Sequence, residues 1–177
     1  MAEQHTRGPS VINTTPAQIL DPQFEALDLR QLAVTTVSLI WTNTQVYPKD
    51  LAIKIRYDPT DISPVFKEGE NSVPCVFRQT VIVRCEYLKD EPGVIKITDM
   101  LIASQNPGAQ LQLTLTNQKI KVTEPKKTSS WQMTTFTDSS TTYSIDKVSE
   151  GLTFTFSCNL PCMTCLPNDP DYCLSCN

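Results

Sequence analysis

The chain has 177 residues, 40% of them hydrophobic and 19% charged, with 13 prolines and 5 glycines, which fits one ordinary globular domain plus a small appendix and excludes collagen-like and strongly disordered chains. The formal net charge of −4 makes nucleic acid an unfavourable partner. Apolar runs such as VSLIW stop far short of the ~20 residues of a membrane-spanning helix, so no membrane span is expected.

Residues 1–30 predict an extended N-terminal arm, because polar residues, prolines and scattered apolar residues are mixed there without a sustained period. The segment VINTTPAQIL is apolar at both ends and suits a strand donated to a neighbouring subunit. Its contact residues would be Val11, Ile12, Ile19 and Leu20. Asn13 begins an Asn-Thr-Thr sequon, which would carry a glycan in a secretory pathway. The arm lacks the features of a secretory signal, so an exported precursor would begin ahead of Met1 or would already have lost its signal.

From Leu32 onward, short runs rich in Val, Ile, Thr, Phe, Tyr and Trp alternate between apolar and polar residues, as half-buried strands do. Eight such runs are expected to be strands: residues 34–42, 51–57, 73–78, 80–87, 94–102, 111–116, 130–136 and 152–156. Turn residues separate these runs, and no stretch of a dozen residues shows helical periodicity. Residues 31–157 are therefore predicted to form an all-β domain, an antiparallel β-sandwich of immunoglobulin-like or Greek-key order.

Two cysteines in the middle of the chain, Cys75 and Cys85, are ten positions apart. One unbroken strand would hold their Cα atoms ~33 Å apart, whereas a disulfide needs roughly 4.4 to 6.8 Å. A hairpin that turns near residues 78–80 would bring them together, so a Cys75–Cys85 disulfide is expected. Two separate buried thiols are the alternative.

Residues 158–177 hold five cysteines and almost no apolar surface, so this segment cannot fold by burial. The cysteines are Cys158, Cys162, Cys165, Cys173 and Cys176. In an oxidising compartment they would form disulfides that staple a coreless tail, whereas in a reducing one the two C-x-x-C pairs would suggest a four-thiolate zinc site. The seven-residue spacer between those pairs is short for zinc, and a zinc site would leave Cys158 without a partner. Disulfides are therefore favoured, and no metal or other cofactor is expected.

Two stretches carry a resemblance to a known family. The tail CNLPCMTCLPNDPDYCLSC resembles the first unit of furin-like, growth-factor-receptor-type cysteine-rich repeats, in particular those of large surface proteins of ciliates and related protists. Residues 111–156 are similar to the β-domain segment that precedes such repeats, with a strand ending in Asn, a Pro/Lys/Ser/Thr stretch, an aromatic strand and a Tyr-x-Ile-Asp element in that order. The resemblance covers roughly residues 70–177.

The resemblance implies an oxidised, extracellular setting at the cell surface. It also implies that the first tail cysteine pairs with the third and the second with the fourth, which gives Cys158–Cys165 and Cys162–Cys173. Cys176 would then have no mate within the chain, because the next repeat supplies it in proteins of this kind. The chain is therefore expected to be a fragment, to be processed, or to use Cys176 between subunits.

These features predict a non-enzymatic structural subunit of an extracellular surface coat, appendage or fibril. Subunits would self-associate head to tail into a homo-oligomer or filament, through a strand donated from the arm to an edge of the neighbouring sandwich. The alternative is a ligand-binding module of a surface receptor or adhesin, for carbohydrate or protein. Its stacking surfaces would lie among Trp41, Trp131, Tyr143 and Tyr172, although both tryptophans occupy strand patterns that favour the core.

An enzyme is not expected, because the sequence shows no nucleophile with a matching base and no glycine-rich phosphate loop. The one histidine, His5, lies in a polar stretch and is expected to be solvated. Three acid pairs lie beside turns, where turn chemistry or a weak calcium contact explains them: Asp58/Asp61, Asp90/Glu91 and Asp169/Asp171. The Ser/Thr-rich stretch 126–144 would suit O-linked glycans on an exported protein, or simply the solvent face of strands.

Overall fold

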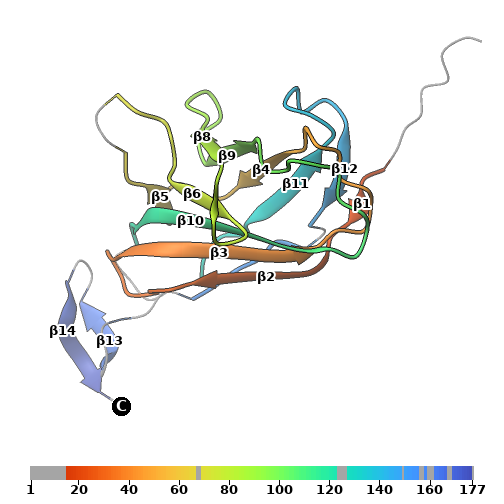
Figure 1. Ribbon diagram of the computed structural model, residues 1–177. Coiled ribbons are helices and arrows are strands. Elements are labelled where there is room, and N and C mark those ends of the chain that lie inside the picture. Colours follow the sequence, from red (N-terminus) through yellow and green to blue (C-terminus); the bar gives the residue numbers. More distant parts are fainter. Residues whose placement is uncertain are drawn as a thin grey trace, which may run out of the picture.

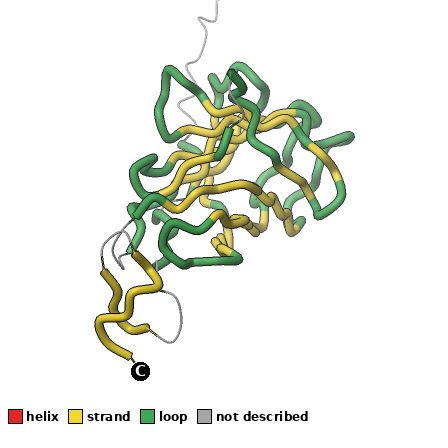
Figure 2. The backbone as a smooth tube through the Cα atoms, turned by 90° about the vertical axis from the view of Figure 1, so that its left-hand side faces the viewer, coloured by secondary structure: helices red, strands yellow, loops and turns green. Residues whose placement is uncertain are grey.

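The computed structural model describes residues 15–66, 69–122, 127–148, 150–155, 158, 162–166 and 169–176. Within these residues the chain forms strands and no helix, which confirms the all-β prediction (Figures 1 and 2). Two sheets pack face to face as a sandwich, and a separate two-stranded hairpin follows near the C-terminus.

The strands of the sandwich divide into two sheets, named sheet A and sheet B here. Sheet A contains, in spatial order, β1 (Ala17–Gln18), β12 (Ser144–Lys147), β11 (Gln132–Phe136), β4 (Ala52–Arg56), β9 (Val94–Thr98) and β8 (Arg84–Tyr87). Sheet B contains, in spatial order, β2 (Leu20–Ala26), β3 (Val34–Thr42), β10 (Gln110–Ile120), β6 (Cys75–Phe77) and β7 (Val81–Ile82), and β5 (Ile62–Pro64) also pairs with β10. The pairs are antiparallel, as predicted, except that β1 runs parallel to β12.

Alternate residues of the strands face the core, as the period-two pattern predicts. The inward residues of β3, of the β4 region and of β10 are all buried: Val37, Leu39 and Trp41; Leu51, Ile53, Ile55 and Tyr57; Leu111, Leu113 and Leu115. In β10 the alternation shifts by one position at a bulge, where Asn117 has a φ of 55°. After the bulge Gln118 and Ile120 face inward, and both are 0% exposed.

The sandwich begins earlier in the chain than expected. Within the predicted arm, residues 17–26 form β1 in sheet A and β2 in sheet B. The chain changes sheets at Ile19, whose backbone N–H donates to the carbonyl oxygen of Lys147 at 2.9 Å. The predicted boundary at residue 30 is therefore corrected, and an arm ahead of the sandwich would be confined to residues 1–14, which lie outside the described residues.

The predicted strand at 152–156 is not formed within its described part. Leu152 makes one isolated bridge to Trp131, and Thr155 makes one to Lys127. Gly151 lies so close to the opposite chain that an added Cβ would be 1.2 Å from the Ser130 Oγ. The segment thus follows residues 127–131 without extending sheet A as a regular strand.

The C-terminal hairpin consists of β13 (Cys162–Leu166) and β14 (Asp169–Cys176), which pair only with each other among the described strands. We call it the cystine hairpin. Figures 1 and 2 show it at one end of the molecule. In Figure 1 it lies beyond the start of β3, whereas β1 lies toward the opposite end. The hydrophobic cluster of the sandwich contains none of the hairpin's described residues.

Candidate functional site

One β-hairpin contributes its two arms to both sheets. Its turn is formed by residues 78–80, as predicted, and its arms keep one register on both sides of a bend. Near the turn β6 and β7 pair within sheet B, whereas beyond the bend Ser72 pairs with Glu86 of β8 in sheet A. The backbone N–H of Val73 donates to the carbonyl oxygen of Cys85 at 2.8 Å, so the ladder continues past the bend.

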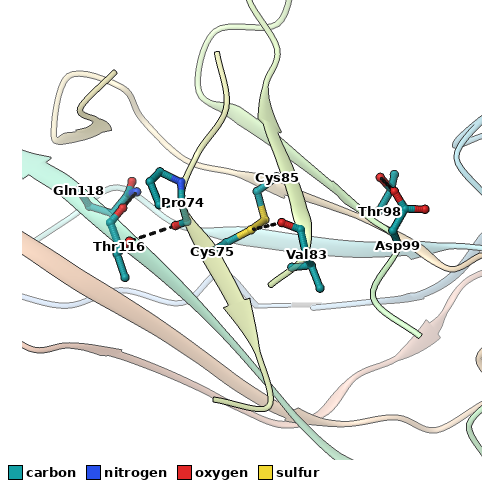
Figure 3. Close-up of a disulfide and its surroundings, with 8 residues drawn as sticks. All are labelled: Pro74, Cys75, Val83, Cys85, Thr98, Asp99, Thr116 and Gln118. Carbon is teal, nitrogen blue, oxygen red and sulfur yellow. Dashed lines mark hydrogen bonds between the residues drawn. A yellow bond between two sulfur atoms is a disulfide. The ribbon is translucent and has the colours of Figure 1, made fainter. Parts of the chain in front are cut away.

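The disulfide between Cys75 and Cys85 spans this bend (Figure 3). Their Cα atoms are 6.2 Å apart, and the two residues are 4% and 1% exposed. Cys75 belongs to sheet B and Cys85 to sheet A, so the bond ties the two layers together. The Cys75 Sγ lies 3.4 Å from the carbonyl oxygen of Val83, at the break between β7 and β8. The predicted pairing is present, and the alternative of two separate thiols is wrong.

A second disulfide, Cys162–Cys173, joins the strands of the cystine hairpin, with the Cα atoms 5.3 Å apart. The resemblance implied this pairing. Cys158 is also disulfide-bonded, whereas the side chains of Cys165 and Cys176 lie outside the described residues, so the Cys158–Cys165 bond and the role of Cys176 stay predictions. A zinc site would need both Cys162 and Cys173 as thiolates, so their pairing favours disulfides over the four-thiolate alternative. Elsewhere in the described chain, no group of three or more His, Cys, Asp or Glu side chains is placed to hold a metal ion.

The residues expected to donate a strand are only partly described. Val11, Ile12 and the sequon residue Asn13 lie outside the described residues. Ile19 is 1% exposed and belongs to the core of its own sandwich, which corrects its assignment as an assembly contact. Leu20, on β2, is half exposed.

The two outer strands of sheet B differ in how readily they could accept a further strand. In β2, Pro22 lacks an N–H, Asp21 has a φ of 46°, and the register of the pairing with β3 shifts. Such features protect a sheet edge against additional pairing. The opposite outer strand, β7, consists of Val81 and Ile82, which are 41% and 87% exposed. β7 therefore exposes aliphatic side chains at its edge of sheet B, although a strand of two residues offers few backbone groups for further pairing.

An apolar groove with a volume of about 300 Å³ lies beside β7. We call it the β7 groove; its lining includes Phe77, Arg78, Val81, Met100, Leu101 and Ile102. Ile102 is 95% exposed, so an aliphatic side chain stands at the rim in contact with water. Arg78 is the charged residue of the lining, and its guanidinium donates a hydrogen bond to the side-chain oxygen of Gln105. The groove thus combines aliphatic surface, one cation and an open strand edge.

A larger hollow of about 630 Å³ lies beside β1 and β12 of sheet A. Its lining includes Ala17, Gln45, Val46, Pro48, Ser144 and Ile145. Tyr143, the residue before β12, is 69% exposed. The hollow therefore combines apolar surface with hydrogen-bonding groups, and the exposed Tyr143 adjoins the lining residue Ser144 in sequence.

Asp146, from the Tyr-x-Ile-Asp element, is 0% exposed and anchors the loop after β3. Its carboxylate accepts hydrogen bonds from the Thr44 hydroxyl at 3.0 Å and the Thr44 backbone N–H at 3.4 Å. The Asp146 backbone N–H donates to the Thr135 hydroxyl at 3.0 Å. Burial raises the pKa of the nearby Tyr47 phenol, and the negative charge of Asp146 raises it further. These groups hold the loop that forms one wall of the larger hollow.

The aromatic residues divide between core and surface. Trp41 and Trp131 are each 1% exposed, and Trp131 stacks on Tyr57 with 4.5 Å between ring centroids. The tryptophans are thus core residues, and neither offers a stacking surface to a ligand. Tyr143 and Tyr172 are 69% and 56% exposed.

Asp58, Asp61 and Glu91, from two of the acid pairs, have structural partners. Asp61 is 1% exposed, and its carboxylate accepts the backbone N–H of Ser129 at 2.8 Å. Asp58 accepts the backbone N–H of Thr60 at 2.8 Å within its own turn. Glu91 accepts a hydrogen bond from Lys54 at 3.0 Å, which lowers the pKa of the Glu91 carboxyl. The side chains of Asp169 and Asp171 and the whole of His5 lie outside the described residues.

Sequence reasoning identified the cysteines of the site but missed Ile82 and Ile102. Both belong to runs predicted as strands, and a period-two pattern does not tell which aliphatic residue ends up on an open edge. Comparison of the chain with protein-family models, curated proteins and solved structures finds no match. No helix within the described ranges is long and apolar enough to cross a bilayer.

Proposed function

We propose that this chain is a non-enzymatic structural subunit of an extracellular surface coat, appendage or fibril. The observation that carries the proposal is the placement of the disulfides: Cys75–Cys85 ties the two sheets, and Cys162–Cys173 holds a hairpin outside the hydrophobic core. Disulfides of this structural kind form and persist in oxidising compartments, which supports an extracellular location. The resemblance of the tail to repeats of protist surface proteins supports the same location.

Assembly of identical subunits is the second part of the proposal. Strand donation remains one route, but β1 and β2 already belong to the chain's own sandwich, so a donated strand would come from residues 1–14. Glycosylation at Asn13 would add a bulky hydrophilic group to that same segment. A head-to-tail contact that does not close into a ring propagates into a filament.

The experiment uses the full chain secreted from eukaryotic cells. Alkylation under native and then reducing conditions, followed by mass spectrometry, should show every cysteine except Cys176 protected by a disulfide within the chain. Negative-stain electron microscopy and sedimentation velocity should show filaments or long oligomers that grow with concentration. Reduced tail cysteines in freshly isolated protein, or a monomer at every concentration, would contradict the proposal.

A second candidate function is supported by the larger hollow beside β1 and β12. A ligand-binding surface module would use its apolar wall of Val46, Pro48 and Ile145 together with exposed Tyr143. A saturable ligand from a glycan array or a pull-down, with binding reduced by Tyr143→Ala, would favour this function. Saturable binding that Tyr143→Ala leaves unchanged would count against a ligand-binding site formed by the hollow and Tyr143.

A further inference from the structure

We propose that the outer face of sheet B binds a glycan that carries a carboxylate, in a hollow beside the hairpin turn formed by residues 78–80. The hollow has a volume of about 310 Å³. We call it the glutamine hollow; its lining includes Gln23, Ile40, Arg78, Gln79, Gln110 and Gln112. The inference goes beyond the proposed function, and this hollow is separate from the larger one beside β1 and β12, since the two share no lining residue.

The register of sheet B places three of these side chains in one row. Ile40 on β3 pairs with Gln23 on β2 and with Gln112 on β10, and the three strands are neighbours in the sheet (Figure 1). Paired residues of adjacent strands point to the same face of a sheet. Leu39, the residue before Ile40, is buried in the core, so the row faces outward. Because neighbouring strands lie about 4.8 Å apart, the Cα atoms of the two glutamines are about 10 Å apart, with an aliphatic side chain between them.

The hairpin turn adds a cation and a further amide beside this row. The backbone N–H of Arg78 donates to the carbonyl oxygen of Gln112 at 2.9 Å, which holds the turn against β10. The Gln79 side-chain amide donates to the side-chain oxygen of Gln112 at 3.3 Å. The Arg78 guanidinium lies 5.2 Å from the centroid of the Phe77 ring and donates to the side-chain oxygen of Gln105. Contacts with β10 and with Phe77 thus place both central residues of the turn at the hollow.

The backbone of the turn points to a role for its side chains beyond folding. Arg78 and Gln79 have positive φ angles of 49° and 64°, and the Thr80 N–H donates to the Phe77 carbonyl oxygen at 3.3 Å. Turns with two positive φ angles favour Asn followed by Gly, which adopt this conformation at little cost. Longer side chains are strained there, and strain of this kind is concentrated at ligand-binding and active sites. The two strained residues are also the two that the turn contributes to the hollow.

The chemistry of the hollow fits a sugar with an acidic group. Four of its lining residues are glutamines, whose amides both donate and accept hydrogen bonds, as sugar hydroxyl groups do. Among the described residues of the lining, Arg78 is the charged one, and a guanidinium binds a carboxylate through two parallel hydrogen bonds. A guanidinium has five N–H donors, so the bond from Arg78 to Gln105 leaves donors for a second partner.

The amount of charge limits the ligand to a weakly acidic glycan. One arginine in the lining and a net charge of −4 for the chain disfavour a polyanion such as nucleic acid. Ile40 offers aliphatic surface to the C–H groups of a sugar ring, in the middle of the row of amides. The ligand class is therefore a glycan with a single carboxylate in the bound part, supplied by a uronic or a sialic acid.

The first experiment titrates small sugars into the full, oxidised chain and follows the side-chain amide signals of its glutamines by two-dimensional NMR. The probes are the acidic sugars cellobiouronic acid and sialyllactose, which distinguish the two sources of the carboxylate, and their neutral counterparts cellobiose and lactose. At least one acidic sugar should bind saturably and shift the signals of the hollow's glutamines, roughly tenfold or more tightly than its neutral counterpart. Equal binding of acidic and neutral sugars, or no binding of either acidic sugar, would overturn the inference. Binding of the peptide acetyl-Gly-Glu-Gly-amide in place of the sugars would overturn it too.

Single variants test the assigned residues. Arg78→Gln should weaken binding of the acidic sugar roughly tenfold or more and remove its advantage over the neutral counterpart. Gln112→Ala should weaken binding of both sugars. Arg84→Gln and Gln132→Ala are the matched controls, because these exposed residues lie on β8 and β11 of sheet A, and both should bind as wild type does. Undiminished binding by Arg78→Gln would contradict the inference.

A double variant distinguishes a binding role from a folding role. Arg78→Asn combined with Gln79→Gly gives the turn the residues that its φ angles favour. This variant should resist urea at least as well as wild type and yet lose binding of the acidic sugar. Wild-type binding by the double variant would overturn the inference, and a double variant less stable than wild type would contradict the argument from backbone strain. Neither result depends on whether the chain self-associates.

Discussion

Gly93 occupies a turn in which both backbone conformation and space exclude a side chain. Its φ is +80°, and an added Cβ would lie 2.2 Å from the carbonyl oxygen of Tyr57. The backbone N–H of Tyr57 donates to the Gly93 carbonyl at 2.9 Å, so the clashing segment is also hydrogen-bonded in place. Gly108 has a similar φ of +85° but open space around the missing Cβ.

Alanine substitutions at these two glycines distinguish the cost of a positive φ from the cost of a steric clash. We expect Gly93→Ala to lower the free energy of unfolding by about 3 kcal/mol and Gly108→Ala by about 1 kcal/mol, because only the first adds a backbone clash to the cost of a positive φ. Urea unfolding followed by tryptophan fluorescence would measure both. Equal losses in the two variants would show that the backbone at Tyr57 moves aside freely.

Two buried tyrosines predict how stability changes at alkaline pH. Burial raises the pKa of both Tyr47 and Tyr57 in the folded chain, from about 10 in an unfolded one. Above pH ~10 the folded state then binds more protons than the unfolded state, so stability falls as pH rises. Tyr47→Phe or Tyr57→Phe should each remove up to about 1.4 kcal/mol per pH unit from that slope. Denaturant midpoints at several pH values from 9 to 11 would test this, and a slope that neither substitution changes would contradict it.

At the scale of elements, the bent hairpin and its disulfide form a covalent link between the two sheets. Replacing both Cys75 and Cys85 by alanine removes a closed loop with a sequence separation of 10. The chain-entropy relation for a loop of this size predicts a loss of about 3 kcal/mol in the free energy of unfolding. Chemical denaturation of the double variant would measure it. Wild-type protein reduced under denaturing conditions and then compared in the same buffer should show a similar loss, and a loss below about 1 kcal/mol would mean that packing alone holds the bend.

The strands that could be predicted are those whose two faces differ clearly. Residues 34–42 match β3 because every second residue from Val37 to Trp41 is apolar and faces inward, and the same alternation holds for the region of β4. β1 and β2 were assigned to an arm because Pro22 and the change of sheet at Ile19 break the alternation. The predicted strand 94–102 ends at Thr98, because Asp99 has a φ of 60° and turns the chain.

In the candidate site, too, only the features that depend on nearby residues in the sequence could be predicted. Cysteine spacing predicted the Cys75–Cys85 bond because a disulfide has a short reach, and that constraint is local in sequence. It did not predict that the bond joins two sheets, since the break at Val83 leaves no mark in the apolar pattern. The β7 groove combines residues 77–81 with residues 100–102, and their meeting depends on the tertiary fold.

At the scale of the whole molecule, the hydrophobic cluster of the sandwich includes no described residue of the cystine hairpin. The hydrophobic cluster extends from Ile19 to Val148, with partly buried residues as far as Phe154. A chain that ends at residue 157 should therefore keep its free energy of unfolding within about 0.5 kcal/mol of the full chain. Parallel urea titrations would measure this. A loss of several kcal/mol would show instead that the hairpin stabilises the sandwich.

The parallel pairing of β1 with β12 bears on how a string of such subunits would respond to tension. β1 is the first described strand and β12 the last described strand of the sandwich, and the two run in the same direction. Pulling the two chain ends apart would shear these strands along their length. The backbone hydrogen bonds between them would then bear the force together and would not break one at a time. We expect single-molecule stretching to record one abrupt rupture per subunit, and gradual yielding at low force would contradict a force-bearing role.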